Sequence, residues 1–223
     1  MALTVIIPTL NAARFLPATL VALRTTPELV DDILVVDGGS QDGTVPVATA
    51  AGARVLTAER GRGAQLAAGV AAARGDWLLL LHADTVLGPG WAAAVSAHVA
   101  RSPQKAGYFH FAVASNDPRA RRLERAVAWR CRALALPYGD QGLLIHRDLL
   151  RAMGGIRPLP LMEDVDLVRR IGRPRLVILD ATAHTAAEKW ERDGWYRRSA
   201  RNLACLSLYF LGIPPRLIAR LYT

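Results

Sequence analysis

An apolar run at residues 33–36 ends on the carboxylate of Asp37, and glycines and a serine follow at residues 38–40. An alanine-rich stretch of helical character comes next. This order predicts a buried strand that carries Asp37 to the carboxyl edge of a sheet, followed by a turn and a helix. Because ligands of open α/β sheets bind at that edge, the segment constrains both the fold class and the position of the site.

The first hundred residues repeat this alternation. Further apolar runs of strand length lie at residues 3–7, 54–57 and 77–81, and helical patterns fall between the runs, at roughly residues 12–25, 45–51 and 64–74. Strands that alternate with helices predict a parallel sheet. Since every residue of 77–81 is apolar, that strand is expected to be covered on both faces. Residues 1–100 are therefore predicted to form a Rossmann-like, nucleotide-binding half.

The rest of the chain is less regular. Strands are predicted at residues 108–113 and 177–179, helices at 118–136 and 165–171, and an apolar helical tail at 203–213 that Pro214 and Pro215 stop. A chain of 223 residues is long enough to bury a full core and fits one domain. We therefore expect a single α/β domain over residues 1–223, with residues 201–223 as its helical tail.

Composition restricts the partners and the compartment. The formal charge of +9 favours a polyanionic partner, which is nucleic acid, anionic lipid or a phosphorylated ligand. The two cysteines, Cys131 and Cys205, lie far apart in apolar surroundings and are expected to be reduced and buried. The chain meets Pro8 too early for a signal peptide, and no apolar stretch reaches the roughly 18 residues of a membrane span. We expect a cytoplasmic protein. Its arginine-flanked tail has two alternatives, contact with the inner face of a membrane and docking on the domain as a core helix.

Four more short segments stand at positions where chemistry is expected. They are Pro8-Thr9-Leu10-Asn11, His82-Ala83-Asp84, Gly139-Asp140-Gln141-Gly142 and Met162-Glu163-Asp164. With the Asp37 turn, they follow the order found in inverting glycosyltransferases of family 2, and the chain resembles that family over most of its length. It is most similar to a bacterial subgroup named for a proposed part in arsenosugar biosynthesis.

The resemblance implies a GT-A fold, which is a Rossmann-like, mostly parallel sheet flanked by helices. It implies a nucleotide-diphosphate sugar of the UDP or GDP type as donor and a small-molecule or lipid-linked acceptor. Residues 101–200 would then form the acceptor and catalytic half of the domain. No nucleic acid is expected as a partner.

Residues of the first half are predicted to hold the donor. The resemblance implies that Pro8 and Asn11 surround the base and that Asp37 contacts the base or the ribose. The alternative for Asp37 is that it only caps a turn. Arg60 and Arg62 stand among glycines between a strand and a helix, an arrangement that lets backbone approach a diphosphate while arginine neutralises its charge.

His82-Ala83-Asp84 takes the place of the family's DXD motif. The resemblance implies that Asp84 binds Mg²⁺ or Mn²⁺, hard cations that suit carboxylate and phosphate oxygens. His82 replaces the first aspartate, and it either contacts the ribose or is a satisfied histidine at a strand end. Relatives with a late histidine imply His184 as a third metal ligand. Lys189 and Trp190 resemble a basic–tryptophan pair that closes over the diphosphate.

The acids at residues 163–166 open a predicted helix. Acids at a helix N-terminus can simply favour the helix dipole. The resemblance implies instead that Asp164 is the general base that deprotonates the acceptor hydroxyl, with Glu163 and Asp166 as the next candidates. Asp140 and Gln141 are predicted to bind the acceptor through hydrogen bonds, and Asp166 is expected on the same side. An ordinary polar turn is the alternative for Asp140 and Gln141.

Three functions are alternatives to that of an inverting, metal-dependent glycosyltransferase. A sugar-phosphate nucleotidyltransferase should have a glycine-rich, arginine-containing loop after its first strand, where this chain has residues 8–11. A non-catalytic, membrane-associated protein that binds nucleotide sugars would need no base at Asp164. A nucleic-acid-binding protein would fit the basic charge, but no such motif occurs, and Asp84, Glu163 and Asp164 would repel phosphate in the absence of a metal.

Overall fold

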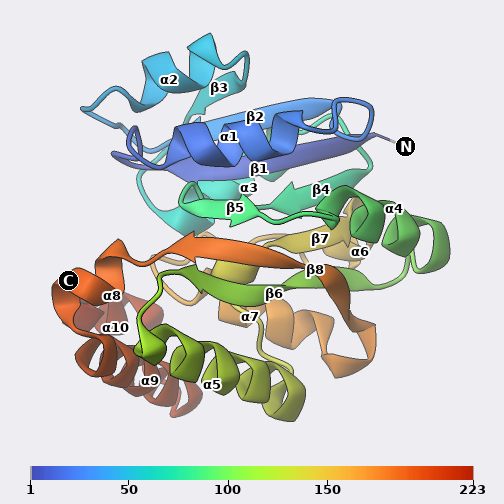
Figure 1. The fold of residues 1–223 in the computed structure, drawn as a ribbon. Helices are drawn as coiled ribbons and strands as arrows, with labels where there is room; N and C mark the ends of the chain where they lie inside the picture. The colour runs from blue at the N-terminus through green and yellow to red at the C-terminus, as the bar shows by residue number, and fades with distance from the viewer. Residues whose placement is uncertain (1, 223) are drawn as a thin grey trace.

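The computed structural model describes residues 2–222. Its strands are β1 (Leu3–Thr9), β2 (Asp32–Asp37), β3 (Arg54–Thr57), β4 (Trp77–Leu80), β5 (Thr85–Leu87), β6 (Ala106–Ala114), β7 (Leu143–His146) and β8 (Leu176–Ala186). Its helices are α1 (Leu16–Arg24), α2 (Thr44–Ala50), α3 (Arg62–Ala72), α4 (Trp91–Arg101), α5 (Pro118–Leu134), α6 (Arg147–Ala152), α7 (Glu163–Ile171), α8 (Glu188–Asp193), α9 (Trp195–Phe210) and α10 (Pro215–Tyr222). The strands form one sheet in the order β3-β2-β1-β4-β7-β6-β8-β5 (Figure 1).

The N-terminal half of the sheet is parallel. Strand β1 pairs in parallel with β2 and β4, and β2 pairs in parallel with β3. All four residues of β4 are buried, as the unbroken apolar run predicts for a strand covered on both faces. Thr9 and Asp37 are register partners at the ends of β1 and β2, so the two polar segments that follow these strands start side by side.

The C-terminal half mixes both directions. Strand β7 runs antiparallel to β4 and to β6, whereas β6 and β8 run in parallel along their whole length. Short β5 pairs antiparallel with β8, and the backbone N–H of Ala186 donates to the carbonyl of Asp84 at 3.0 Å. This pairing brings the segment after β8 beside the end of β4. The mixed α/β architecture with a mainly parallel sheet confirms the predicted fold class.

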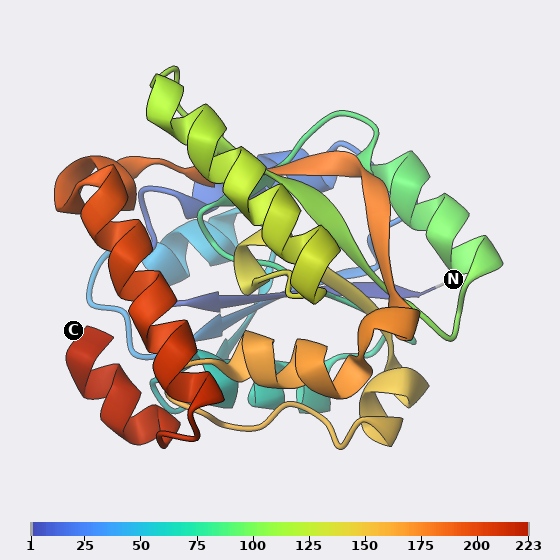
Figure 2. The same ribbon diagram turned by 90° about the horizontal axis from the view of Figure 1, so that it is seen from below.

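Helices cover both faces of the sheet. Helices α1, α2 and α4 pack on one face over a core that includes Leu20, Leu79 and Val95, and α3 and α7 pack on the other over Ile6 and Leu78. Helices α5, α9 and α10 gather at the bottom of the molecule in Figure 1, where Figure 2 shows α5 and α9 facing the viewer.

The tail is longer and more closely docked than predicted. Helix α9 starts at Trp195 rather than near residue 203, and α10 begins at Pro215, so the Pro-Pro pair separates two helices. Cys205, Leu206 and Ile218 are buried against the domain. Both cysteines are buried and free, as expected. Within residues 2–222, no helix is long and apolar enough to cross a membrane.

Candidate active site

Two adjoining cavities open at the carboxyl edge of the parallel strands. The first is lined by residues 8–12 at the end of β1 and just beyond it, and by residues 60–62 at the start of α3. The second is lined by the N-terminal end of α7, by Tyr138 and Asp140, and by α8, α9 and α10. The residues common to both cavities are Arg62, His82, Asp84 and Lys189. A ligand that spans the cavities would therefore pass a partition of two cations, a carboxylate and an imidazole.

Asp37 braces the turn after β2 and lines neither cavity. Its Oδ2 accepts from the backbone N–H groups of Gly39 and Ser40 at 2.9 and 2.8 Å, and its Oδ1 accepts from the hydroxyls of Ser40 and Thr9. Burial raises the pKa of Asp37, but these hydrogen bonds outweigh burial and hold the pKa below its ordinary value. A direct contact between Asp37 and a nucleoside stays a prediction.

Pro8 and Asn11 line the first cavity, and their contact with a base stays a prediction. Asn11 has a φ of +51°, a left-handed conformation that asparagine tolerates better than most residues. Its side-chain oxygen accepts from the N–H of Gln41 at 2.9 Å, and its own N–H donates to the Ser40 hydroxyl at 2.8 Å. Hydrogen bonds to the segment after β2 thus hold the segment after β1, which lines the first cavity.

Asp84 forms an ion pair with Lys189 where the two cavities adjoin. The Nζ of Lys189 lies 2.7 Å from its Oδ2, and the Asp84 side chain is only 12% exposed. Burial raises the pKa of Asp84, whereas Lys189 and His82 lower it, and the net pKa lies below its ordinary value. Burial and the neighbouring Arg62 keep the pKa of His82 well below its usual range, so this imidazole is neutral at physiological pH.

The two acids at the N-terminus of α7, Glu163 and Asp164, line the second cavity next to the residues that it shares with the first. Glu163 is buried, and its Oε1 lies 3.2 Å from the Nη1 of Arg62. Burial raises the pKa of Glu163 more than Arg62 lowers it. The Oδ2 of Asp164 accepts from the Gly139 N–H at 2.8 Å, which ties the start of α7 to the turn after Tyr138.

Position 139 requires glycine because the imidazole of His82 lies very close to its backbone. A Cβ atom at this position would lie 2.5 Å from the Nε2 of His82 and 3.5 Å from the Oδ2 of Asp164. A side chain here would have to displace the imidazole of His82, the residue in the first DXD position, whereas Asp164 would be at ordinary contact distance. Next to it, Met162 precedes α7 with a φ of +65°, a strained conformation for a residue other than glycine. Backbone strain of this kind gathers at functional sites.

Asp140 is half-buried and has a buried, unpartnered oxygen in the second cavity. Its Oδ1 has no hydrogen-bond partner. Burial raises the pKa of Asp140 to about 6, and the charges of Asp164 and Asp84 add to this effect, although Arg130 opposes it. The group therefore titrates near neutral pH and can either donate or accept a hydrogen bond to a ligand.

Two residues predicted to bind the acceptor have partners inside the domain. Gln141 is 2% exposed, and its amide donates to the Phe109 carbonyl at 3.0 Å and accepts from Arg130 and the Tyr138 N–H. Asp166 is buried between Arg157 and Arg170, at 2.9 and 2.7 Å. Neither side chain lines either cavity, so a contact between the acceptor and Gln141 or Asp166 stays a prediction.

The structure does not bring His184 to Asp84. His184 lines neither cavity, and its ring lies beside Gly88, whereas its neighbour Thr185 lines the second cavity. Successive side chains of a strand point to opposite faces, so only one of these neighbours can face the site. Across residues 2–222, no group of three or more His, Cys, Asp or Glu side chains is placed to hold a metal ion by itself. The role of His184 as a metal ligand stays a prediction, and the position of its ring beside Gly88 does not favour it.

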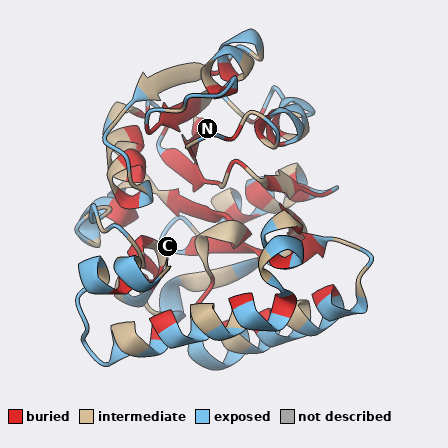
Figure 3. Ribbon diagram, turned by 90° about the vertical axis from the view of Figure 1, so that its left-hand side faces the viewer, coloured by how far each residue is buried: buried red, intermediate tan, exposed pale blue. Residues whose placement is uncertain are grey.

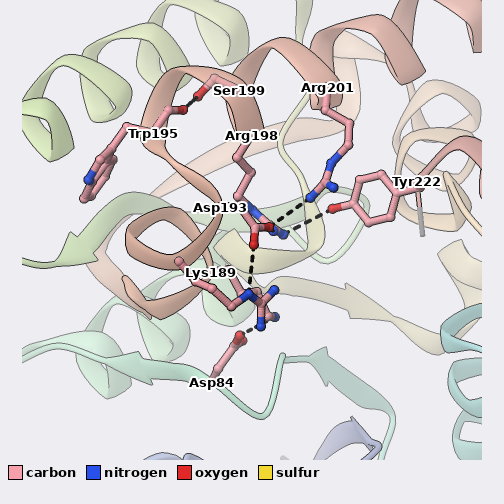
Figure 4. A network of polar contacts seen from close by, with 9 residues as sticks. Asp84, Lys189, Asp193, Trp195, Arg198, Ser199, Arg201 and Tyr222 are labelled. Atoms are coloured by element: carbon pink, nitrogen blue, oxygen red, sulfur yellow. Dashed lines mark hydrogen bonds and ion pairs between the residues drawn. The ribbon is translucent and has the colours of Figure 1, made fainter.

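Trp190 lines the second cavity next to Lys189, and closure of this pair over a diphosphate stays a prediction. Residues from the tail, which the sequence did not point to, also line this cavity: Arg198, Asn202 and Tyr222. Figure 4 shows how Asp193 organises this wall, since its carboxylate binds Arg198 at 2.7 Å and Arg201 at 3.0 Å. Arg198 also donates to the Tyr222 hydroxyl at 3.3 Å. The only available sequence signal was the density of arginines after residue 190.

Comparison with known proteins identifies the class. The family described as Glycosyl transferase family 2 matches residues 4–152, more than half of the chain. The chain belongs to glycosyl transferase family 2. This confirms the predicted class, a glycosyltransferase; membership in the arsenosugar subgroup stays a prediction.

Solved structures share the fold. Glucosyl-3-phosphoglycerate synthase from Mycobacterium tuberculosis, solved with Mn²⁺, UDP and glucosyl-3-phosphoglycerate, is 20% identical with a TM-score of 0.61, over 96% of this chain and 81% of that one. Mannosyl-3-phosphoglycerate synthase from Rubrobacter xylanophilus is 20% identical with a TM-score of 0.63, over 95% and 75%. S. aureus TarS is 14% identical with a TM-score of 0.67, over 93% and 65%.

A curated TPR repeat-containing protein of Synechococcus elongatus is 39% identical over 79 residues. The match covers 34% of this chain and 19% of that relative, so the chain spans only a small part of its length.

Proposed function

We propose that the protein is an inverting, divalent-metal-dependent glycosyltransferase that moves a sugar from a nucleotide-diphosphate sugar to an acceptor hydroxyl. The observation that carries this proposal is the meeting of two cavities at Arg62, His82, Asp84 and Lys189. The first cavity would hold the nucleotide and the second the acceptor. The diphosphate would lie at the partition, where the cations stand.

Polar and basic residues at the first cavity are proposed to bind the nucleotide. Pro8 and Asn11 would border the base, and Asp37 would support them by fixing the turn. Arg60 lines this cavity, while Arg62 is common to both, so both are placed to neutralise a diphosphate. The donor is of the UDP or GDP type, and the UDP complex of the mycobacterial synthase favours UDP as the first ligand to test.

The chemistry of Asp84 fits a hard divalent cation. Its carboxylate already pairs with a cation, and Mg²⁺ is often held by one or two carboxylates together with substrate phosphates and water. Asp84 would hold Mg²⁺ or Mn²⁺ without His184. When bound, the metal supplies charge neutralisation for the leaving diphosphate.

Asp164 would be the general base. It stands at the second cavity beside Glu163, and its Oδ2 is fixed by the Gly139 N–H. From there it would take the proton of the acceptor hydroxyl, whose oxygen attacks the anomeric carbon directly as the bond to the diphosphate breaks. A single displacement of this kind inverts the anomeric configuration. Glu163, buried against Arg62, would orient that arginine.

Asp140 would receive the acceptor, because its unpartnered oxygen lies in the second cavity. A small-molecule acceptor in the cytoplasm and a lipid-linked acceptor at the inner face of a membrane both satisfy this proposal. A non-catalytic binder of nucleotide sugars is the second candidate. It would show donor binding without transfer, and transfer would not depend on Asp164.

The proposal is tested by heating the protein with UDP or GDP, each with and without Mn²⁺. A ligand that binds the native state raises the unfolding temperature according to its affinity. We expect one nucleotide to stabilise the protein and the metal to increase that effect. No stabilisation by any nucleoside diphosphate would contradict the proposal.

Lys189→Met is expected to bind Mn²⁺ more tightly than the native protein when no nucleotide is present. The ammonium that pairs with Asp84 would no longer compete with the cation. Because the lysine side chain is 47% exposed, the gain should be up to about fivefold, the size of an exposed ion pair. Titration of Mn²⁺ by electron paramagnetic resonance measures it, with Lys105→Met as the control. Equal affinities would show that Lys189 leaves the cation site open.

Asp140 is expected to make stability depend on pH. Its folded-state pKa of about 6 lies above the ordinary value of 3.8, so the folded protein keeps the proton where the unfolded chain has lost it. Stability should fall as pH rises between these two values, by up to roughly 3 kcal/mol. Denaturant unfolding from pH 4 to pH 7 measures this loss, and Asp140→Asn should reduce it. Identical profiles would contradict the assignment.

A further inference from the structure

The positive charge of the protein is concentrated on three helices. Helices α5, α9 and α10 carry eleven arginines and one glutamate, a net charge of +10, whereas the rest of the chain has 17 basic and 18 acidic residues. These helices lie together at the bottom of the molecule in Figure 1. Eight of these eleven arginines are exposed, whereas Arg130, Arg198 and Arg201 are not, so the exposed surface of these helices carries most of the net charge.

The outward side of α9 is uncharged along most of its length. Residues at helical spacing face solvent there: Tyr196, Ala200, Leu203, Ala204 and Ser207, followed by Leu211 just after the helix. Leu203 is 63% exposed and Leu211 is 78% exposed. Figure 3 shows that the helices at the bottom of the molecule bury the side toward the sheet and expose the other.

Helices α5 and α10 extend this stripe and supply its charge. On α5, exposed Trp129 lies at helical spacing from the exposed Arg122, Arg125 and Arg132. The Nη1 of Arg122 lies 2.9 Å from the Tyr196 hydroxyl, which joins α5 to α9. On α10, the exposed Leu217 and Leu221 alternate with Arg216 and Arg220. We call the outward sides of these three helices the docking face.

We propose that the docking face binds the surface of a bilayer that contains anionic lipid. Leucine and aromatic side chains beside arginines are the composition of helices that lie in a membrane interface. Arginines near such a surface are attracted to anionic headgroups. A nucleic acid would meet the arginines but leave Leu203 and Leu211 in water. A second copy would bring one basic face against another, which repels.

The docking face lies on the far side of helices that border the catalytic cavity. Arg198 and Asn202 of α9 and Tyr222 of α10 line the second cavity, whereas Leu203 and Leu217 face outward. Docking would hold that cavity about one helix diameter, roughly 10 Å, from the headgroups. The proposal goes beyond glycosyl transfer, and its test needs no donor or acceptor.

Flotation of the full-length protein with vesicles tests the proposal. The protein should float with vesicles of phosphatidylcholine and phosphatidylglycerol and remain in solution with phosphatidylcholine alone. Binding should weaken with salt, because the screening length falls from about 10 Å at 0.1 M to about 3 Å at 1 M. If the protein floats equally with both vesicle types, or with neither at low salt, the proposal is overturned.

Two double variants separate the two contributions. Arg125→Glu with Arg216→Glu should lower binding at least about tenfold, since each arginine near an anionic surface is worth about fivefold. Leu203→Glu with Leu211→Glu should lower it to a similar extent through the apolar contact. The matched controls are Arg101→Glu on α4 and Val21→Glu, which is 66% exposed on α1 at the opposite side of the sheet. Losses no larger than those of the controls would overturn the proposal.

Other occupants of the face give different results. Tight binding of a single-stranded RNA that the leucine variant leaves unchanged would identify a nucleic-acid surface. A dimer in analytical ultracentrifugation that the leucine variant dissociates would identify a self-association surface. Either result would overturn membrane docking. All four altered positions of the double variants are exposed, so circular dichroism should report native folding, and the lipid and salt dependence of the native protein stands without any variant.

Discussion

Asp164→Asn is expected to bind the sugar nucleotide as the native protein does and to lose at least about a hundredfold in transfer rate, the lower range for removal of a general base. An amide at this position can still accept from the Gly139 N–H, but it cannot take a proton from the acceptor. The change should therefore reduce kcat with little effect on donor affinity. Single-turnover transfer and calorimetric titration with UDP measure the two properties separately.

Asp148→Asn is the matched control, since this carboxylate of α6 has an exposed side chain and lines neither catalytic cavity. Near-native transfer by Asp164→Asn would move the base to Glu163, the neighbouring acid of the second cavity. Loss of donor binding together with transfer would mean that Asp164 orders the partition between the cavities rather than accepting a proton.

The parallel half of the fold was predictable because its strands are buried on both faces. Residues 33–36 and 77–81 are continuous apolar runs, and each ends where a polar segment begins. Such runs locate a strand and its end with no knowledge of its neighbours. The short β5 and β7 were not predicted, since their three or four residues have no period of their own and are fixed by pairing with β8, β4 and β6.

Side-chain direction was the weakest part of the prediction of the site. The sequence placed His184 near the metal, but β8 presents Thr185 to the cavity, and a shift of one residue in a strand reverses the face. Gln141 and Asp166 have the polarity of ligand-binding residues, yet they satisfy groups inside the domain. Their roles depend on contacts with distant residues, which a local motif does not encode.

Asp84→Ala is expected to abolish the part of nucleotide stabilisation that depends on metal. In the native protein, Mn²⁺ and UDP at a hundred times their dissociation constant should stabilise the fold by about 2.7 kcal/mol. Without the carboxylate, UDP should act alike with and without Mn²⁺, because within residues 2–222 no cluster of three or more His, Cys, Asp or Glu side chains offers another site. Scanning calorimetry with each ligand, alone and together, measures the difference.

The unliganded variant should remain folded, since the contact it loses is an ion pair with a half-exposed lysine, worth at most about 1 kcal/mol. Asp180→Asn, which alters an exposed carboxylate on β8, is the control. Comparison with Lys189→Met shows whether Asp84 itself binds the metal. If Asp84→Ala loses metal dependence while Lys189→Met keeps or strengthens it, Asp84 is the metal ligand and Lys189 its competitor. If Asp84→Ala retains full metal-dependent stabilisation, the cation binds elsewhere and the role given to the His-Ala-Asp segment is wrong.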